Sequence, residues 1–366
     1  MIPKTQFLTT DALTRKRWAR DLFLTLLPAV EFNELTGKTS SDIVQLRTEL
    51  GKGEGDNITF GIRLPLVGEG VVGDDTVEGN EERLRFRNFG LTIQELNHAV
   101  DTGGKMEEQR VPYNLMQEGK DGLQEWWGAK LSDYLINTLV GNSAYRIAGK
   151  VFAQAITDPD TDHFIAVNQA DGTAVATAEA AITSADVIDL QMLDRMKQRA
   201  EVPLHPAYSI GDTPAGSGYK LRPLMKNGKP YYRVIMHNYV FDALRQNTNV
   251  GQWGDLLRSA NKLQIPYVEI EYNGMLISKS ERIPKMLTVG SGGVYRTILL
   301  GCQAACWAWG GAGDSKSTVM SFVPYTKDAE RYVMIRGGGI FGIKKTTFDS
   351  KDYGIITGSS YGVRMS

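Results

Sequence analysis

Three short stretches of the chain imitate catalytic motifs, and each lacks the neighbours that its chemistry requires. The glycines of 337–342 have the G-x-G-x-x-G spacing of a dinucleotide loop, but the IKKTTF that follows favours a strand over the necessary helix. The G-x-S-x-G at 358–362 needs a helix followed by Asp and His, and the six residues after Ser360 contain no His. GKT at 37–39 lacks the upstream glycine of a phosphate loop. We therefore predict no enzyme activity and no bound cofactor.

The side chains that bind metals are also scattered. The four histidines are His98, His163, His205 and His237, and none has a second His or Cys at ligand spacing. DPDTDH at 158–163 resembles the start of a calcium loop, but its sixth and twelfth positions hold His163 and Gln169 instead of Gly and Glu. We interpret this stretch as an Asp-rich turn, and Cys302 and Cys306 as small buried residues. No metal site is expected from these residues.

Composition limits the class of protein. The 366 residues suffice for two domains, or for one domain with large excursions. A net charge of -1 predicts no general affinity for nucleic acid or for anionic membranes. No run of 18 apolar residues occurs, so no membrane span is expected. The basic and apolar stretch 15–27 lacks the cleavage site of a signal peptide, which favours a protein made and used on the cytosolic side.

The stretch 111–141 is the strongest helix signal. Pro112 suits the first turn and Gly141 suits the residue after the last turn. Large apolar residues recur every four positions and predict one buried face, and these core residues are Leu123, Trp127, Leu131, Leu135 and Leu139. Such a helix would be roughly 40 Å long, at about 1.5 Å per residue.

A long β-hairpin is predicted before this helix. From Asn57 the apolar residues alternate with polar ones as in a strand with one buried face. The returning strand begins near Arg83, with Arg83, Arg85 and Arg87 on one face and Leu84 and Phe86 on the other. The apolar parity then changes at 88, which predicts a bulge or a strong twist. An isolated two-stranded ribbon is marginally stable, so we expect this hairpin to lie on its own body or on another copy.

The turn of this hairpin, 68–82, contains six carboxylates and no Lys or Arg. These acidic residues are Glu69, Asp74, Asp75, Glu78, Glu81 and Glu82. They repel one another unless a cation or a basic surface neutralises them. Three interpretations remain open: a calcium site, docking on arginines of a partner, and a plain solvated tip.

The first 50 residues resemble an arm that carries a basic cluster. This cluster consists of Arg15, Lys16, Arg17 and Arg20. Trp18, Leu22 and Leu26 are spaced by four, as one helical face requires. The arm is either a solvated helix packed on its own domain or a segment that reaches a neighbouring subunit.

The remainder alternates helices and strands and predicts an α+β fold. The expected elements are a helix at Ser184–Ala200 capped by Ser184, a turn at Asn227-Gly228, a strand at Tyr231–Met236, a helix from Asn238, a short helix at Trp253–Lys262, paired strands turning at Asn273-Gly274, an apolar helix or strand at Thr297–Trp309, and several short strands within Arg331–Gly362.

Three stretches in this order resemble the major capsid proteins of tailed double-stranded-DNA bacteriophages, in the short-tailed branch with the HK97-type shell fold. They are 68–93 leading through KMEEQR into the long helix, NGKPYYRVIMHNYVFDALRQN with the helix after it, and ILLGCQAACWAWG with FGIKKTTFDSKDYGIITGSS. The resemblance implies five segments: an N-terminal arm at 1–54, an E-loop hairpin at 55–97, a peripheral domain with a spine helix at 98–184, an axial domain at 185–325, and closing strands that return to the peripheral domain at 326–366.

The resemblance also implies a function and partners. The chain would assemble with itself as hexamers and pentamers into an icosahedral shell, in the host cytoplasm, and would end in the virion capsid. Packaged double-stranded DNA would lie on the inner face, with a portal and possible decoration proteins as further partners and no membrane. Because Met1 leads directly into the arm, we expect any scaffolding to be a separate protein. The alternatives are an encapsulin-like cellular compartment and a soluble α/β enzyme with an unrecognised site.

Overall fold

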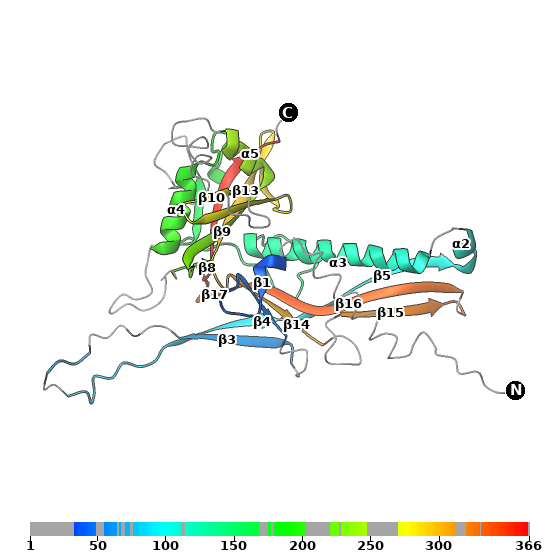
Figure 1. Cartoon of the computed structure of the whole chain (residues 1–366), viewed down its shortest axis with the longest axis horizontal. Coiled ribbons are helices and arrows are strands. Elements are labelled where there is room, and N and C mark those ends of the chain that lie inside the picture. The colour runs from blue at the N-terminus through cyan, green and yellow to red at the C-terminus, as the bar shows by residue number, and fades with distance from the viewer. Residues whose placement is uncertain are drawn as a thin grey trace.

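The computed structural model describes residues 33–48, 55–63, 66, 70–73, 76–110, 114–167, 175–176, 179–202, 220–226, 228–246, 270–311, 320–329 and 331–364. It is an elongated molecule with a lobe at the top, an arm built on one long helix, and a hairpin that projects away from that arm (Figure 1). The basic residues at 15–20 and the helix expected at 253–262 lie outside the described residues.

The elongated part of the molecule, which is distinct from the N-terminal arm named above, is a six-stranded sheet covered by a long helix. Its strands follow the order β1 (Thr36–Gly37), β2 (Val44–Arg47), β14 (Ala305–Trp309), β16 (Tyr332–Lys345) and β15 (Met320–Lys327), with β5 (Gln94–Gly104) also paired to β16. β16 is a single 14-residue strand, so the two short strands expected within 332–345 are fused. The short helix α2 (Lys105–Arg110) joins β5 to the region before the long helix.

The long helix α3 (Leu115–Val140) confirms the main prediction from the sequence. Asn114 caps its start by accepting hydrogen bonds from the backbone N–H groups of Met116 and Gln117 at 3.0 and 3.3 Å. Gly141 ends it with a φ of 73°, the left-handed conformation that glycine adopts most easily. The predicted core residues are all buried, with exposed fractions of 0–1%: Leu123, Trp127, Leu131, Leu135 and Leu139. They pack with Trp307, Trp309, Phe322 and Phe341 of the sheet.

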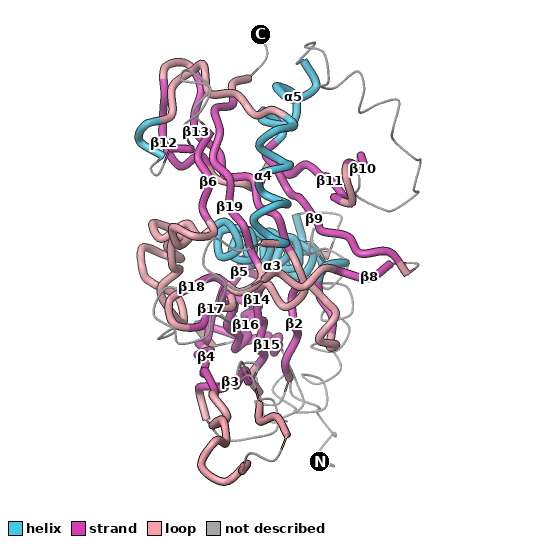
Figure 2. The backbone as a smooth tube through the Cα atoms, turned by 90° about the vertical axis from the view of Figure 1, so that its left-hand side faces the viewer, coloured by secondary structure: helices cyan, strands magenta, loops and turns pink. Residues whose placement is uncertain are grey.

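The lobe is built on a nine-stranded sheet. Its main path is β10 (Ile270–Tyr272), β11 (Met275–Ser280), β9 (Lys229–His237), β13 (Gly292–Leu300), β19 (Ile355–Gly362), β6 (Phe164–Val167) and β7 (Val175–Ala176); β12 (Lys285–Val289) pairs with β13, and β8 (Leu224–Lys226) pairs with β9. The helices α4 (Leu190–Glu201) and α5 (Asn238–Gln246) supply apolar side chains to its core. The end of α3 lies between the two sheets (Figure 2).

Four short elements complete the described structure. They are the 3-10 turns at Asn33–Leu35 and Glu179–Ala181, the small pair β17 (Thr347–Phe348) and β18 (Lys351–Asp352), and the hairpin β3 (Asn57–Arg63) and β4 (Phe86–Thr92). No described helix is both long enough and apolar enough to cross a bilayer.

The sequence predicted the local turns of the lobe well. The strand and helix expected at 231–236 and from 238 are present, and the expected turn before them joins β8 to β9 with Gly228 at a φ of 75°. Asn273 and Gly274 have φ values of 44° and 70° and connect β10 to β11. These positive values at both central residues are those of the tight hairpin turn that Asn-Gly favours.

The expected start of one helix of the lobe was wrong. α4 starts at Leu190, and its N-cap is Asp189, whose carboxylate accepts a hydrogen bond from the Met192 N–H at 2.8 Å. Ser184, the expected cap, lies before the helix. Val187 forms an isolated bridge with Tyr361 and therefore belongs to the sheet edge. The apolar stretch 297–309, expected as a helix or a strand, forms strands: it contains the end of β13, a turn and β14, which are buried in the two sheets.

Candidate functional site

The root of the β3–β4 hairpin packs on the six-stranded sheet of its own chain. Ile58, Phe60 and Ile62 are half-buried on one face of β3, and the residues between them are exposed. Opposite them, Phe89 and Leu91 of β4 are buried in a small core shared with Cys306, Ala308 and Phe348. The predicted alternation of β3 is therefore confirmed, and only the outer part of the hairpin extends beyond the body (Figure 1).

Of the bulge or strong twist predicted in the returning strand, the bulge is absent. β4 begins at Phe86 and pairs with β3 in unbroken register, from Arg63 opposite Phe86 to Asn57 opposite Thr92. The alternation of apolar and polar residues changes phase at 88 because Leu84 and Phe86 are not buried: they are 55% and 58% exposed. The strand expected to begin near Arg83 begins at Phe86, and two large apolar side chains face outward.

Charged side chains fasten the hairpin root. Arg87 forms a short ion pair with Asp349, so this arginine is used within the chain. The Lys344 ammonium donates to the Gly90 carbonyl oxygen at 2.7 Å and lies 4.7 Å from the centre of the Phe89 ring. Burial lowers the pKa of Lys344. The Arg47 guanidinium lies 5.4 Å from the Phe60 ring, a distance at which cation–π attraction acts.

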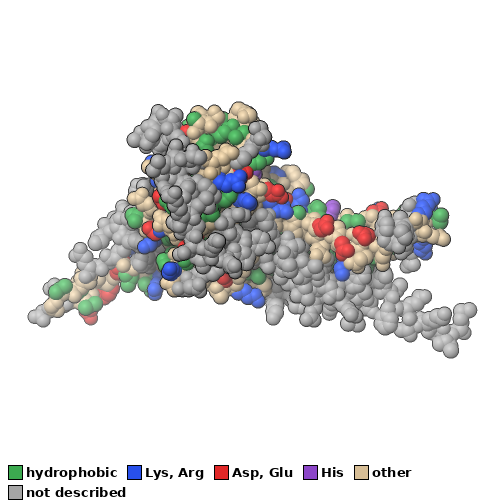
Figure 3. All heavy atoms as spheres, turned by 45° about the horizontal axis from the view of Figure 1, so that its top comes forward, with side chains coloured by type: hydrophobic (Ala, Val, Ile, Leu, Met, Phe, Trp, Pro, Cys, Tyr) green, Lys and Arg blue, Asp and Glu red, His purple; other side chains and the backbone are tan. Residues whose placement is uncertain are grey.

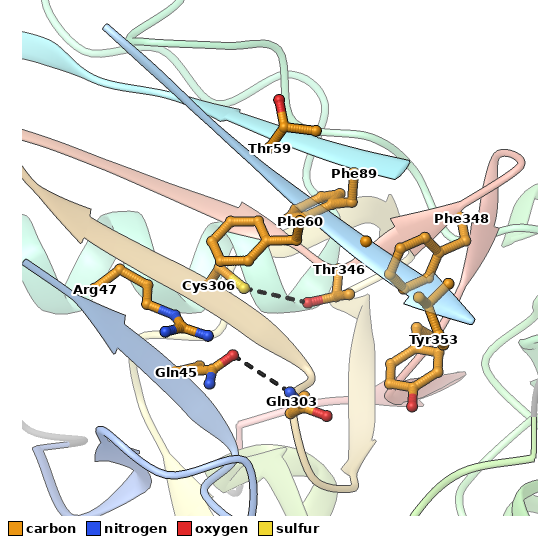
Figure 4. Close-up of a pocket in the computed structure, with 12 residues that line it drawn as sticks. Gln45, Arg47, Thr59, Phe60, Phe89, Gln303, Cys306, Thr346, Phe348 and Tyr353 are labelled. Carbon is orange, nitrogen blue, oxygen red and sulfur yellow. Dashed lines mark hydrogen bonds between the residues drawn. The ribbon is translucent and has the colours of Figure 1, made fainter. Parts of the chain in front are cut away.

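A pocket of about 350 Å³ opens beneath this root (Figure 4). Phe60, Phe89, Phe348 and Tyr353 form its apolar wall, and its polar wall consists of Gln45, Arg47, Gln303, Cys306 and Thr346. Burial raises the pKa of the Cys306 thiol to about 11, so the thiolate needed for nucleophilic attack is scarce at neutral pH. Among the described residues that line this pocket there is no His or carboxylate to act as a base. The pocket therefore has the properties of a packing defect or a docking recess.

The described tip residues of the hairpin are exposed. Glu78, Glu81 and Glu82 lie on this tip; Glu81 accepts from the Gly79 N–H at 2.8 Å, and Glu82 lies 3.8 Å from Arg85. Val72 and Val77 are also exposed, at 82% and 66%. The other three acidic residues named above, Glu69, Asp74 and Asp75, lie outside the described residues. The tip therefore exposes apolar side chains as well as acidic ones.

The arginines of the hairpin differ from one another. Arg83 is exposed and, within the described part of the chain, makes no ion pair, whereas Arg85 has only the long contact to Glu82. Both precede β4, so they belong to the connection between the tip and the strand. Arg83 and Arg85 are therefore available for contacts, and Arg87 is not.

A sealed cluster of charges lies where the two sheets meet. The Lys345 ammonium is 2.7 Å from the Asp352 carboxylate, and these side chains are 1% and 2% exposed. The Asp160 carboxylate is 2.8 Å from His163 Nδ1 and accepts from the Asp352 N–H at 2.7 Å, while Lys351 donates to Asp162 at 2.7 Å. The predicted Asp-rich turn at 158–163 is present, and the carboxylates of Asp160 and Asp162 point into this cluster, whereas that of Asp158 faces Arg296.

The cluster shifts the pKa values of its acids in opposite directions. Burial raises the pKa of Asp352, and Lys345 opposes this rise. Burial also acts to raise the pKa of Asp160, but its hydrogen bond and charge interaction with His163, together with backbone N–H donors, lower it to about 2. Lys, His and Asp are the usual groups of acid–base chemistry, but here Lys345, Asp352 and His163 are only 1–2% exposed. They tie the turn after α3 to β16 and β18, and no grouping of three His, Cys, Asp or Glu among the described residues could hold a metal ion.

Arg296 of β13 forms a second joint. Its guanidinium donates to the carbonyl oxygens of Val140 and Gly141 at 3.1 and 2.6 Å. These two carbonyls belong to the C-terminal end of α3. It also binds both carboxylate oxygens of Glu179, at 2.5 and 3.0 Å. A cation at a helix C-terminus offsets the partial negative charge of the exposed carbonyls. Arg296 therefore attaches the long helix to the sheet of the lobe.

The glycines that imitate a dinucleotide loop have a packing role. A Cβ atom at Gly337 would lie 2.6 Å from Phe322 and 2.9 Å from the Trp127 indole nitrogen. A Cβ at Gly358, in the G-x-S-x-G stretch, would lie 2.3 Å from Met192. Both stretches are strands, β16 and β19, and no helix follows them. Their glycines let large side chains approach the sheets closely.

Solved phage capsids have the same fold. The capsid of Ralstonia phage GP4 is 22% identical, with a TM-score of 0.74 over 91% of this chain and 90% of that chain. The capsid of cyanophage Pam1 is 18% identical, with a TM-score of 0.70 over 93% and 94%. That of Helicobacter pylori bacteriophage KHP30 is 12% identical, with a TM-score of 0.64 over 91% of each chain. The fold is thus the HK97-like mixed α/β fold of phage capsids.

A family model described as phage capsid protein matches residues 6–365. The chain belongs to this family and is a structural protein of the capsid shell. It is also similar to the major capsid protein of Pseudomonas phage KPP25, with 26% identity over 197 residues, which cover 50% of this chain. The match spans about half the length of that relative, 52%.

Proposed function

We propose that copies of this chain assemble, as hexamers and pentamers, into a closed icosahedral shell that encloses double-stranded phage DNA. The observation that carries this proposal is the divided hairpin. Its root is anchored to its own sheet, whereas its outer part exposes Leu84, Phe86, Val72 and Val77 at 55–82%. A two-stranded ribbon with large exposed apolar side chains is marginal alone and is typical of a contact surface.

In this proposal the protein acts by geometry and not by catalysis. The contacts between identical copies are heterologous. They produce a closed ring when the rotation from one copy to the next adds up to a full turn. The acidic tip contacts neighbouring copies, and the basic residues at 15–20 belong to an arm that does the same. DNA lies on the inner face, and a portal occupies one vertex. Assembly takes place in the host cytoplasm.

We further propose the five segments named above, with two changed boundaries. The pairing of β14 and β15 with β16 supports assigning 305–327 to the peripheral domain. The pairing of β19 with β13 supports assigning 355–362 to the axial domain. The N-terminal arm keeps its position at 1–54 and the E-loop at 55–97. The spine helix is α3.

The experiment replaces 68–82 with an Asn-Gly turn. We expect this variant to lose shell assembly while its circular dichroism and melting temperature stay close to those of the unmodified chain, because no described residue of the tip belongs to either core. The matched control replaces the exposed turn at 290–291 with Asn-Gly and should assemble normally. Normal shells from the tip variant would refute the role of the hairpin. Nuclease-protected DNA within phage particles distinguishes a virion shell from a cellular compartment, which would protect none.

A further inference from the structure

The pocket beneath the hairpin root is large enough for a small ligand. Its volume of about 350 Å³ lies at the lower end of the range for pockets that hold small molecules, about 300–1000 Å³. Protein interiors are packed as densely as organic crystals and contain few voids larger than a water molecule. Residues of β2, β3, β4, β14 and β17 line the pocket, so it lies where the hairpin meets the six-stranded sheet (Figure 4). A ligand held there would contact both parts of the subunit.

The apolar wall of the pocket is a row of aromatic rings. The centre of the Phe89 ring lies 5.8 Å from that of Phe60 and 6.1 Å from that of Phe348. The Phe348 ring in turn lies 5.4 Å from that of Tyr353. These separations are typical of attractive contacts between aromatic rings, about 4.5–7 Å. A flat aromatic ligand would extend this row, and it would lose less conformational freedom on binding than a flexible chain.

The opposite wall of the pocket is polar and carries one positive charge. Among the described residues that line the pocket, Arg47 is the single charged side chain, and its guanidinium points between Phe60 and Gln45 (Figure 4). Burial raises the pKa of the Cys306 thiol, and the charge of Arg47 is one of the influences that oppose this rise. Gln45 accepts a hydrogen bond from the Gln303 amide at 3.3 Å, and within the described part of the chain its own amide N–H groups have no acceptor. The polar wall therefore offers donors and a positive charge.

The pocket differs in charge from the outer surface. On the face of the lobe that Figure 3 shows, Lys and Arg side chains are interspersed with Asp and Glu. The described lining of the pocket contains no Asp or Glu. An anionic group on a ligand would thus be attracted by Arg47 and meet no carboxylate in that lining. A hydrogen bond between two ionised groups is about twice as strong as a neutral one, so the pocket favours an anion.

We propose that this pocket binds a small aromatic carboxylate, with its carboxylate on the Arg47 guanidinium and its ring against Phe60 and Phe89. The planar guanidinium matches a carboxylate with two parallel hydrogen bonds, and the phenylalanines supply the apolar contact. Because Arg47 belongs to β2 and Phe60 to β3, the bound ligand connects the six-stranded sheet to the hairpin and holds the hairpin root in place. The inference concerns a single subunit and goes beyond the proposed function.

The test measures the binding of 1-naphthylacetate to the full-length chain by isothermal titration calorimetry. The uncharged 1-naphthylacetamide, which has nearly the same shape, is the comparison. We expect the carboxylate to bind about tenfold or more tightly than the amide, because only the carboxylate forms the charge-assisted contact. Arg47→Met should lower the affinity for the carboxylate to that of the amide and leave the affinity for the amide unchanged. Phe60→Ala should weaken the binding of both probes by a similar factor, because it removes apolar contact alone.

Arg331→Met is the matched control for the charge. The Arg331 guanidinium also lies over an aromatic ring, 5.5 Å from the centre of Tyr332, but its side chain is 70% exposed and does not line the pocket. This variant should bind both probes as the unmodified chain does.

Hydrogen exchange of the unmodified chain locates the site without any substitution. 1-Naphthylacetate should slow the exchange of backbone amides in β3 and β4, whose pairing the ligand stabilises, and should leave those of β9 unchanged. Absence of binding, equal affinities for the two probes, a preference for the carboxylate that survives Arg47→Met, or protection confined to other strands would overturn the inference. Each of these results would leave the proposed shell function intact.

Discussion

Replacement of Trp127 by alanine is the most direct test of the core beneath α3. The indole is fully buried, with its ring centre 5.2 Å from that of Trp126 and 6.0 Å from that of Phe341. It also packs against Gly337, where even a Cβ atom would come within 2.9 Å of the indole nitrogen. The change removes the largest side chain that links the helix to β16.

The expected cost follows from area and from one missing hydrogen bond. Burial of roughly 200 Å² of aromatic surface at about 25 cal/mol per Å² contributes about 5 kcal/mol. The buried indole N–H has no acceptor in the described part of the chain. Its removal therefore relieves a desolvation penalty of roughly 1–3 kcal/mol. We expect Trp127→Ala to lower the free energy of unfolding by about 3 kcal/mol, at the low end of the usual range for such changes.

Trp127→Phe is the matched comparison, because it keeps most of the apolar contact and deletes the unsatisfied N–H. We expect a loss of about 1 kcal/mol or less from it. Thermal unfolding of unassembled subunits measures both variants: at about 2 °C per kcal/mol, the melting temperature should fall by about 6 °C for alanine and by about 2 °C or less for phenylalanine. An unchanged melting temperature for Trp127→Ala, or equal losses for the two variants, would refute this description of the core.

Two further predictions concern the end of α3 and the sealed cluster. Gly141→Ala should lower the free energy of unfolding by about 2 kcal/mol, since the left-handed backbone disfavours alanine and the new Cβ would lie 3.0 Å from the Thr157 carbonyl oxygen; a melting temperature equal to that of the unmodified chain would contradict this. The pKa of Asp160 falls on folding from its usual 3.8 to about 2, so its carboxylate stabilises the folded chain above pH 4 and loses this effect as the pH falls toward 2. Asp160→Asn should therefore flatten acid denaturation over that window, by up to roughly 2 kcal/mol, and an unaltered acid profile would count against the assignment.

The parts of the fold that sequence predicted are those fixed by neighbouring residues. The four-residue spacing of Leu123, Trp127 and Leu131 determines a helix face wherever the helix is placed. Gly141 and the Asn273-Gly274 turn were equally predictable, because their backbone conformations exclude most other residues. Both kinds of signal act within a few positions of the chain.

The parts that were missed depend on partners far away in the chain. Asp160 is hydrogen-bonded to His163, three positions away, but also meets Lys351 and the backbone of Asp352, which a local pattern does not reveal. Lysine is usually a solvated residue, but Lys345 is only 1% exposed, because Asp352 lies opposite it. β5 was not predicted either. Its exposed face is polar, as in a loop, and its pairing with β16 is what makes it a strand.

The hairpin shows both outcomes in one element. Strict alternation predicted β3 correctly, because one of its faces meets the sheet. The same rule failed before β4, where Leu84 and Phe86 face outward and stay more than half exposed among the described residues. The failure of the rule at these residues is itself a sign of a contact that one subunit does not complete.

Electron microscopy of the purified full-length chain tests the central claim most directly. Hollow particles of uniform diameter, with capsomers of five and six copies, are the expected result. A field of small, monodisperse oligomers under conditions in which the chain is folded would contradict the assignment of this protein to a self-closing shell.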